Sequence, residues 1–231
     1  IKQYKNMRDF RQPIIKDNRN LRDKIPSIEK HFQSIEKEVF NFPKVNGLVR
    51  DPNIVTFRDC PICNSDKKEQ LFTKLGFEFV KCPKCKHQFI HNPINEDVLL
   101  NMYEVKESDN LQRVTNKTSF YKEYWEDVYS KYVEYFQSKG IIQGSILDIG
   151  SGSGAFLNFL KNNHKYNLFG TEFAEEVFDD LVEIVGSKEK IFHKIKLEDI
   201  NFEGLSFDLI TMWGVLEHVY NPVKVLKKIS S

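Results

Sequence analysis

Short apolar runs alternate with amphipathic stretches over residues 144–231. SILDIG, YNLFGTE and SFDLITMW are predicted as strands, KIFHKIKLED as a further strand region, and GAFLNFLKNN, AEEVFDDLVEIVG and NPVKVLKKIS as helices. Strands that alternate with helices are typical of βαβ units, which build a parallel sheet. We therefore expect an α/β fold for this part of the chain.

The preceding segment, residues 94–143, has a helical pattern. INEDVLLNMYE is predicted as a helix with Asn95 as its N-cap. A longer helix, rich in aromatic residues, is expected over residues 117–139 and should end at Gly140. We interpret residues 94–143 as a helical linker or lid, in which most of the aromatic rings pack within the core or between domains.

The N-terminal residues 1–55 contain more basic than acidic side chains and few apolar ones. After Ser27, the apolar positions at helical spacing are Ile28, Phe32, Ile35 and Val39. Such a stripe predicts a helix that packs on its own protein, with a partner-binding helix as the alternative. We expect residues 1–55 to form a basic helical extension.

Two CxxC pairs lie within residues 56–93, with eighteen residues between the pairs. They bracket a hairpin-like segment in which Phe77 and Phe79 alternate with polar residues. The four candidate ligands are Cys60, Cys63, Cys82 and Cys85. This spacing is typical of a zinc ribbon, and four thiolates would complete a tetrahedral shell, so the expected Zn²⁺ is structural. A pair of redox motifs is the weaker alternative, because neither CxxC opens a helix after a strand.

Charge and hydropathy limit the partners and the location. With 34 Lys and Arg against 33 Asp and Glu, the net charge of +1 argues against an electrostatic grip on nucleic acid by the whole protein. No apolar stretch is long enough for a membrane span, and the first residues lack the apolar core of a signal peptide. We expect a cytoplasmic protein. The chain begins with Ile1 and stops where the next strand should begin, so we also expect a fragment that lacks its C-terminal strands.

A glycine-rich turn marks the candidate cofactor site. Residues 146–154, ILDIGSGSG, are predicted as a strand that runs into a turn and opens a helix. Glycines let such a turn tighten and let a ligand approach the backbone. Glu172 follows about twenty residues later at the end of a strand, where a carboxylate can bind ribose hydroxyls. Gly150, Gly152 and Ala155 also satisfy the dinucleotide fingerprint, so these features alone leave both NAD and S-adenosylmethionine open.

Asp148 and the block around the last predicted strand distinguish the two cofactors. LDIGSGSG, GTE and FDLITMWGVLEHVYNP resemble the motifs of class I S-adenosylmethionine-dependent methyltransferases of the ubiquinone/menaquinone-methyltransferase-like group. The order of zinc ribbon, helical linker and methyltransferase also resembles a subgroup that includes sugar C-methyltransferases. The resemblance implies a Rossmann-like methyltransferase sheet, of which residues 144–231 would form a partial S-adenosylmethionine-binding domain.

The resemblance also implies residue roles. Asp148 would orient the methionine end of the cofactor, Glu172 would hold the ribose, and Leu197 and Glu198 would lie by the adenine. Met212 and Trp213 would pass near the methionine moiety. The full expected cofactor set is Asp148, Gly150, Ser151, Gly152, Gly154, Glu172, Leu197, Glu198 and Trp213.

The residues expected to act on the acceptor are His218 and Glu217, which follow the last predicted strand. In this fold, substrate residues gather at the carboxyl ends of the strands, so His218 is a candidate base and Glu217 its orienting partner. Their alternative roles are to brace the loop and to cap the next helix. The leading hypothesis is methyl transfer to a small molecule, such as a sugar or glycan precursor. The alternatives are an RNA methyltransferase that uses the ribbon and the basic N-terminus, and a non-catalytic binding or scaffold fragment.

Overall fold

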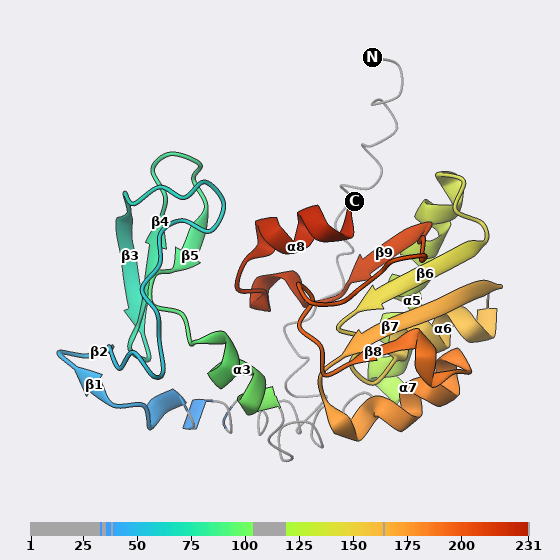
Figure 1. The fold of residues 1–231 in the computed structure, drawn as a ribbon, viewed down its shortest axis with the longest axis horizontal. Coiled ribbons are helices and arrows are strands. Elements are labelled where there is room, and N and C mark those ends of the chain that lie inside the picture. Colours follow the sequence, from blue (N-terminus) through green and yellow to red (C-terminus); the bar gives the residue numbers. More distant parts are fainter. Residues whose placement is uncertain (1–32, 34–35, 38, 104–118, 164, 231) are drawn as a thin grey trace.

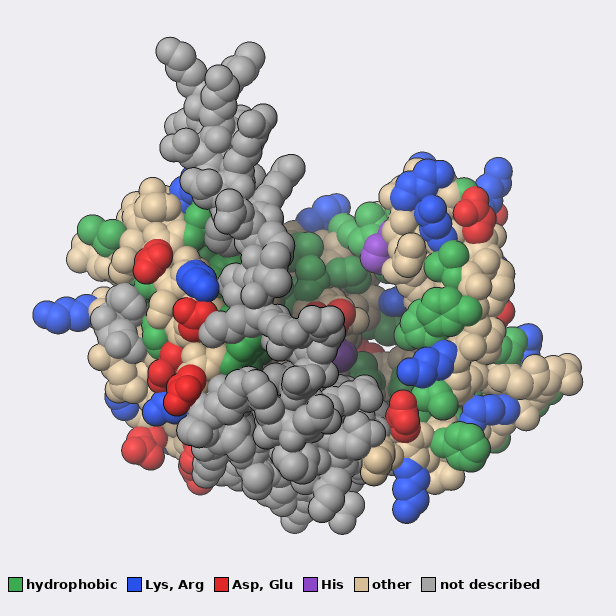
Figure 2. All heavy atoms as spheres, turned by 180° about the vertical axis from the view of Figure 1, so that it is seen from behind, with side chains coloured by type: hydrophobic (Ala, Val, Ile, Leu, Met, Phe, Trp, Pro, Cys, Tyr) green, Lys and Arg blue, Asp and Glu red, His purple; other side chains and the backbone are tan. Residues whose placement is uncertain are grey.

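The computed structural model describes residues 33, 36–37, 39–103, 119–163 and 165–230. The described residues form a small lobe of short antiparallel strands and a larger α/β lobe, with helix α3 (Glu96–Tyr103) between them (Figure 1). Seen from behind, a hollow separates the two lobes, with histidine side chains at its margin (Figure 2). The site must therefore be sought both within the α/β lobe and where the small lobe meets it.

The α/β lobe is built on a parallel sheet. Its strands are β6 (Gly144–Ile149), β7 (Tyr166–Glu172), β8 (Ile191–His193) and β9 (Leu209–Met212), in the order β8-β7-β6-β9. The chain runs from β6 outward to β8 and then crosses to the other side of β6 to form β9. This order places the topological switch between β6 and β9, which is where ligands bind in open α/β sheets. The expected α/β fold with a Rossmann-like sheet is confirmed.

Helices cover both faces of this sheet. On one face, helices α5 (Ser119–Ser138), α6 (Ala155–Asn163) and α7 (Phe178–Val185) share a core with the sheet that includes Ile146 and Leu168 of the strands and Leu181 of α7. On the other face, Leu147, Ile149 and Phe169 are covered by the segment before β9 and by α8 (Pro222–Ile229). Short 3-10 helices occupy Glu175–Val177, Lys188–Lys190 and Leu216–His218. Residues from alternate positions of β6 thus enter two separate cores.

The boundaries of several elements follow from local chemistry. Helix α5 lies within the predicted span, and the chain leaves it through Gly140 at a φ of 91°. Helix α7 ends at Gly186, whose φ of 83° provides the left-handed C-cap. The predicted strand region around residue 191 is shorter than expected: β8 covers only three residues. It ends where Lys194 adopts a φ of 54°, which is incompatible with an extended strand.

The small lobe contains two small sheets. Strands β1 (Lys44–Val45) and β2 (Leu48–Val49) form a hairpin, and β3 (Glu69–Lys74), β4 (Phe77–Lys81) and β5 (Gln88–Ile90) form an antiparallel sheet in that order. The fully buried Asn92 connects the two sheets. Its amide donates to the carbonyls of Val49 and Gly76, and its oxygen accepts from the N–H of Glu78. The hairpin predicted around Phe77 and Phe79 is confirmed.

The start of α3 differs from the prediction. Asn95 directly precedes the helix, and its backbone oxygen accepts from the N–H of Leu99 at 2.9 Å. Its side chain, however, contacts the small lobe: the amide oxygen accepts from Thr56 Oγ1 at 2.6 Å and the amide nitrogen donates to the carbonyl of Pro52 at 2.8 Å. Asn95 therefore ties α3 to the small lobe through its carboxamide.

Of the apolar stripe expected in the N-terminal helix, only Val39 lies within the described residues. It is buried against Val49, Val55 and Phe77, so this position packs on its own protein. Ile28, Phe32 and Ile35 lie outside the described residues. Among the helices that the structure describes, none has the length and apolar character needed to cross a membrane.

Candidate functional site

The turn between β6 and α6 carries three glycines with positive φ. Gly150, Gly152 and Gly154 adopt φ angles of 66°, 54° and 74°. A Cβ on Gly150 would lie 2.6 Å from Val215 Cγ2, and one on Gly154 would lie 2.6 Å from Ile184 Cδ1. A Cβ on Gly152 would meet none of the described residues within 4 Å. Two of the glycines are thus required for packing, whereas no residue that the structure describes covers Gly152, so a ligand could approach its backbone there.

Glu172 closes this turn from the end of β7. Its Oε2 accepts from the N–H of Gly152 at 2.6 Å, and its Oε1 accepts from the N–H groups of Phe173 and Ala174 at 2.7 and 3.0 Å. Each carboxylate oxygen can accept more than one hydrogen bond, so the side chain retains capacity for ligand hydroxyls. The structure places Glu172 at the end of β7, as the sequence predicted, and brings its carboxylate to the glycine turn.

Asp148 lies inside the sheet, at the switch between β6 and β9. It is 2% exposed, and its Oδ1 accepts a hydrogen bond of 2.7 Å from Thr211 Oγ1. Burial raises the pKa of Asp148 to about 7; the hydrogen bond from Thr211 opposes this shift and the negative charge of Glu172 adds to it. A cation bound nearby would favour the ionised carboxylate, so this position is suited to a positively charged ligand.

Hydroxyl groups fix the shape of the turn. Ser151 Oγ donates to the carbonyl of Asp148 at 2.8 Å, while the N–H of Ser151 donates to the carbonyl of Thr171. Thr171 Oγ1 in turn accepts from the N–H of Gly150 at 3.0 Å. Ser151 therefore shapes the turn from inside. Thr171 and Thr211 were not predicted from the sequence, although Thr211 is the only polar residue of β9.

The expected adenine residues, Leu197 and Glu198, follow β8. Leu197 packs against the core formed by Leu147, Ile149 and Phe169 on one face of the sheet. The backbone oxygen of Glu198 accepts from Lys228 Nζ, which fastens this segment to α8. Their contact with adenine remains a prediction.

Trp213, which directly follows β9, packs into an aromatic cluster. Its ring lies 5.0 to 5.3 Å, between centroids, from those of Tyr129, Tyr132 and Phe156. The first two belong to α5, so this helix reaches the end of β9. The buried Nε1 of Trp213 has no hydrogen-bond partner among the described residues. The expected role of Trp213 beside the methionine moiety remains a prediction.

His218 and Glu217 lie on the short helix Leu216–His218 after β9, and both are exposed. The N–H of His218 donates to the carbonyl of Val215 at 2.9 Å, which holds the turn of this helix. Val215 is also the residue that packs against Gly150. The candidate base is therefore carried by a loop that contacts the glycine turn.

A second hollow lies away from these residues. It has a volume of about 720 Å³ and is lined by the segment before β9 and by α8, including Ile200, Phe207 and Lys228. None of the expected cofactor residues lines it. We do not assign the cofactor to this hollow, because neither the glycine turn nor the switch between β6 and β9 opens into it.

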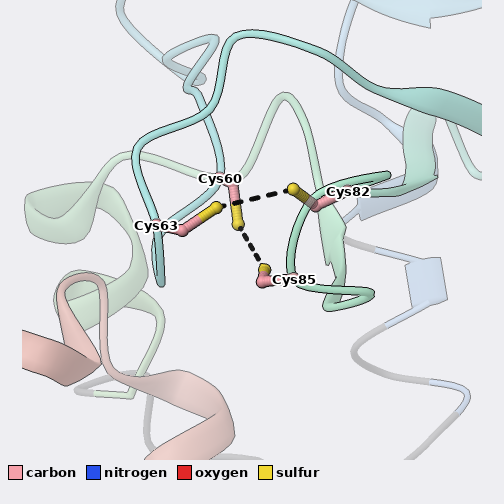
Figure 3. Close-up of side chains that lie close together, drawn as sticks. All are labelled: Cys60, Cys63, Cys82 and Cys85. Atoms are coloured by element: carbon pink, nitrogen blue, oxygen red, sulfur yellow. Dashed lines mark hydrogen bonds between the residues drawn. The ribbon is translucent and has the colours of Figure 1, made fainter.

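The four cysteine sulfurs converge in the small lobe (Figure 3). The Sγ atoms of Cys60 and Cys85 are 3.5 Å apart, those of Cys63 and Cys82 are 3.6 Å apart, and all four lie within 4.8 Å of one another. A tetrahedral zinc with bonds of about 2.3 Å would place its sulfurs roughly 3.8 Å apart. The donor set and its spacing therefore fit zinc. Within the residues that the structure describes, this is the only cluster of such ligands.

The two halves of the cysteine cluster have the same backbone geometry. In one, the N–H of Asn64 donates to the carbonyl of Cys60; in the other, the N–H of Lys86 donates to the carbonyl of Cys82. Asn64 and Lys86 both adopt positive φ angles, of 54° and 67°. Hydrogen bonding from the backbone N–H of Cys85, against an opposing effect of burial, lowers the pKa of Cys82 to about 6. Such turns present thiolates to a common centre.

Comparison with known proteins agrees with the geometry of the α/β lobe. Residues 118–231 match a protein family described as "Methyltransferase domain". This stretch contains the parallel sheet, the glycine turn and the loop with His218. The C-terminal part of the chain is therefore similar to a methyltransferase domain. None of the curated proteins matches the chain.

Two solved structures are similar to the chain. One is a Methanococcus maripaludis protein described as an S-adenosyl-L-methionine-dependent methyltransferase, with 19% identity and a TM-score of 0.45 over 54% of this chain and 57% of the other. The second is magnesium protoporphyrin IX methyltransferase from Synechocystis with bound S-adenosylhomocysteine, with 14% identity and a TM-score of 0.43 over 58% of this chain and 66% of the other. The chain thus spans less than two thirds of either protein.

Proposed function

We propose that this protein transfers a methyl group from S-adenosylmethionine to a small molecule, such as a sugar or a glycan precursor. The observation that carries the proposal is the contact between the glycine turn and Glu172. The Oε2 atom of Glu172 lies 2.6 Å from the backbone nitrogen of Gly152, whose Cα side is open among the described residues. The family match over residues 118–231 supports it independently.

Asp148 favours this cofactor over NAD. When bound, S-adenosylmethionine supplies a methyl group that its sulfonium charge has already made electrophilic. The buried carboxyl of Asp148 lies at the strand switch, where it would face the cationic methionine end. Glu172 would accept the ribose hydroxyls, and the open face of Gly152 would admit the ligand.

The chain then has to align the acceptor and remove its proton where the acceptor atom carries one. His218 is proposed as the base, since it is exposed on the loop that follows β9 and contacts the glycine turn through Val215. Glu217, its neighbour, would orient the acceptor or the imidazole. Resemblance to enzymes with a ribbon, a linker and a methyltransferase domain supports a sugar-like acceptor, and the net charge of +1 gives little support for RNA.

The proposed role of the four cysteines is to hold one structural Zn²⁺. Four thiolates would leave no open coordination position for an acceptor or a water. The metal would therefore stabilise the small lobe and take no part in the chemistry.

Calorimetry tests the cofactor assignment. We expect S-adenosylhomocysteine to bind the wild-type protein and NAD to give no heat. Incubation of small-molecule extracts with labelled S-adenosylmethionine, followed by mass spectrometry, should then identify the methylated acceptor. Binding of NAD in preference to S-adenosylhomocysteine would contradict the proposal.

A further inference from the structure

One arginine of the small lobe contacts the loop that carries His218. Arg58 lies two residues before Cys60, and its Nη1 donates to the backbone oxygen of Tyr220 at 2.8 Å. The guanidinium carbon also lies 5.2 Å from the centroid of the Tyr220 ring. Figure 1 shows α8 and the loop before it on the side of the α/β lobe that faces the small lobe. The contact joins residues 162 positions apart in the sequence.

Arg58 is held firmly on its own side. The backbone N–H of Arg58 donates to the backbone oxygen of His91 at 2.9 Å, and the backbone oxygen of Arg58 lies 2.8 Å from His91 Nδ1. Its side chain is half-buried, and burial lowers the pKa of the guanidinium, which nevertheless stays charged. The position of the arginine is therefore set by the end of β5 and by the adjoining cysteine turn.

The loop that Arg58 contacts is fixed at its other points too. Val215 packs on Gly150 at the start of the loop, and the Asn221 side chain caps α8 by accepting from the N–H of Lys224 at 3.1 Å. His218 lies between these anchors, close to Tyr220 in the sequence. A continuous series of contacts thus runs from the cysteine turn through Arg58 and the loop to the glycine turn.

A second link attaches the small lobe near the expected adenine segment. Lys196 Nζ lies 3.0 Å from Glu96 Oε2 and 2.8 Å from Asp97 Oδ1, at the start of α3. Paired, partly exposed charges of this kind contribute little each, so this link fixes the orientation of the small lobe more than it adds stability. With two attachment points, the cysteine turn has a defined position relative to the loop.

We propose that Arg58 is a positioning residue that holds the loop carrying His218, so that the order of this loop depends on the metal-bound state of the cysteine cluster. The catalytic consequence rests on the proposed function, whereas the coupling between the cluster and the loop does not. Loss of the metal releases the turn that carries Arg58, and the loop loses a charged hydrogen bond together with the contact to the Tyr220 ring.

Hydrogen exchange on the full chain, followed by mass spectrometry, tests the coupling. In zinc-loaded Arg58→Ala, amides of residues 214–221 should exchange about ten-fold faster or more, as expected for loss of a charged hydrogen bond. The zinc content and the exchange of the glycine turn should stay as in the wild type. Arg50→Ala is the matched control, because Arg50 is an exposed arginine of the same lobe that lies over Phe57.

Metal removal completes the test. A chelator should speed exchange at residues 214–221 in the wild type and add little in Arg58→Ala, because the link is already broken. Unchanged exchange in Arg58→Ala, or an equal increase on chelation in both proteins, would overturn the proposal. If Arg58→Ala loses zinc, Tyr220→Leu removes the ring contact from the other lobe. It should then speed exchange with zinc retained, and no change would equally overturn the proposal.

Turnover and ligand binding separate this inference from the proposed function. With an acceptor in hand, Arg58→Ala should lower kcat while the affinity for S-adenosylhomocysteine stays within about two-fold, and Arg58→Lys should restore part of the loss. A wild-type protein that fails to bind S-adenosylhomocysteine would contradict the methyltransferase assignment, whereas the exchange data would still decide the coupling.

Discussion

Replacing Asp148 with asparagine should change how the stability of the protein depends on pH. Burial raises the pKa of this carboxyl from 3.8 to about 7. Below pH 3.8 the carboxyl of Asp148 is protonated in both the folded and the unfolded chain, so it does not lower the stability of the folded state at such a pH. As the pH rises towards 7, the unfolded chain ionises while the folded protein keeps its proton, and the folded state loses stability.

The size of the effect follows from the pKa difference. About three pKa units correspond to at most ~4 kcal/mol, lost between pH 4 and pH 7 at ~1.4 kcal/mol for each pH unit. The asparagine side chain of the variant is neutral at every pH, so Asp148→Asn removes this loss. Its amide oxygen can still accept from Thr211 Oγ1, whereas its NH₂ group needs a partner of its own, at a cost of about 1–3 kcal/mol that does not vary with pH. The slope, and not the absolute stability, is therefore the informative quantity.

Urea unfolding of both proteins between pH 5 and pH 8, followed by tryptophan fluorescence, measures that slope. The free energy of unfolding of Asp148→Asn relative to the wild type should rise with pH up to about 7 and then level off. Parallel pH profiles would refute the assignment of a raised pKa to this buried carboxyl. Because a cationic ligand favours the ionised form, binding of S-adenosylmethionine to the wild type should also release a proton near pH 7, and this release should disappear in the variant.

The wild-type protein should contain about one zinc per chain, and Cys82→Ser should lose it and unfold residues 57–92 first, as measured by elemental analysis and hydrogen exchange; a folded, reduced wild-type sample without zinc would refute this. Glu172→Ala should weaken S-adenosylhomocysteine binding by about 1–3 kcal/mol in calorimetry, and equal affinity would mean that the ribose binds elsewhere. Gly152→Ala should cost roughly 1–2 kcal/mol of stability for its positive φ and should also reduce affinity, because its methyl group would occupy the open face of the turn; full affinity would place the ligand elsewhere. His218→Ala should leave affinity almost unchanged and lower turnover by roughly 10²–10⁴, and normal turnover across pH 6 to 9 would remove it from the mechanism.

Features that depend on neighbouring residues could be predicted from the sequence. The strand, turn and helix around residues 146–163 follow from a buried apolar run, closely spaced glycines and helical periodicity. Glu172 could be placed at the turn because consecutive parallel strands end at the same edge. The cysteine cluster likewise followed from spacing alone, since each CxxC turn fixes two sulfurs locally.

Features that depend on long-range packing could not be predicted in the same way. Nothing near Arg58 in the sequence indicates a contact with Tyr220, because that contact depends on how α3 sets the small lobe against the α/β lobe. The ring of Trp213 packs on α5, a helix that lies about eighty residues earlier in the sequence. In each case the partner is determined by the packing of whole elements.

Asp148 and Thr211 lie between these two extremes. Asp148 is the only charged residue of β6 and Thr211 is the only polar residue of β9, and a buried polar side chain needs a hydrogen-bond partner. The order of the sheet makes β6 and β9 neighbours, and their parallel register sets Asp148 opposite Thr211. Once the strand order makes β6 and β9 neighbours, pairing these two buried polar side chains is the simplest way to satisfy both. A buried carboxyl in a predicted strand is therefore a signal from which the partner strand, as well as the ligand, can be inferred.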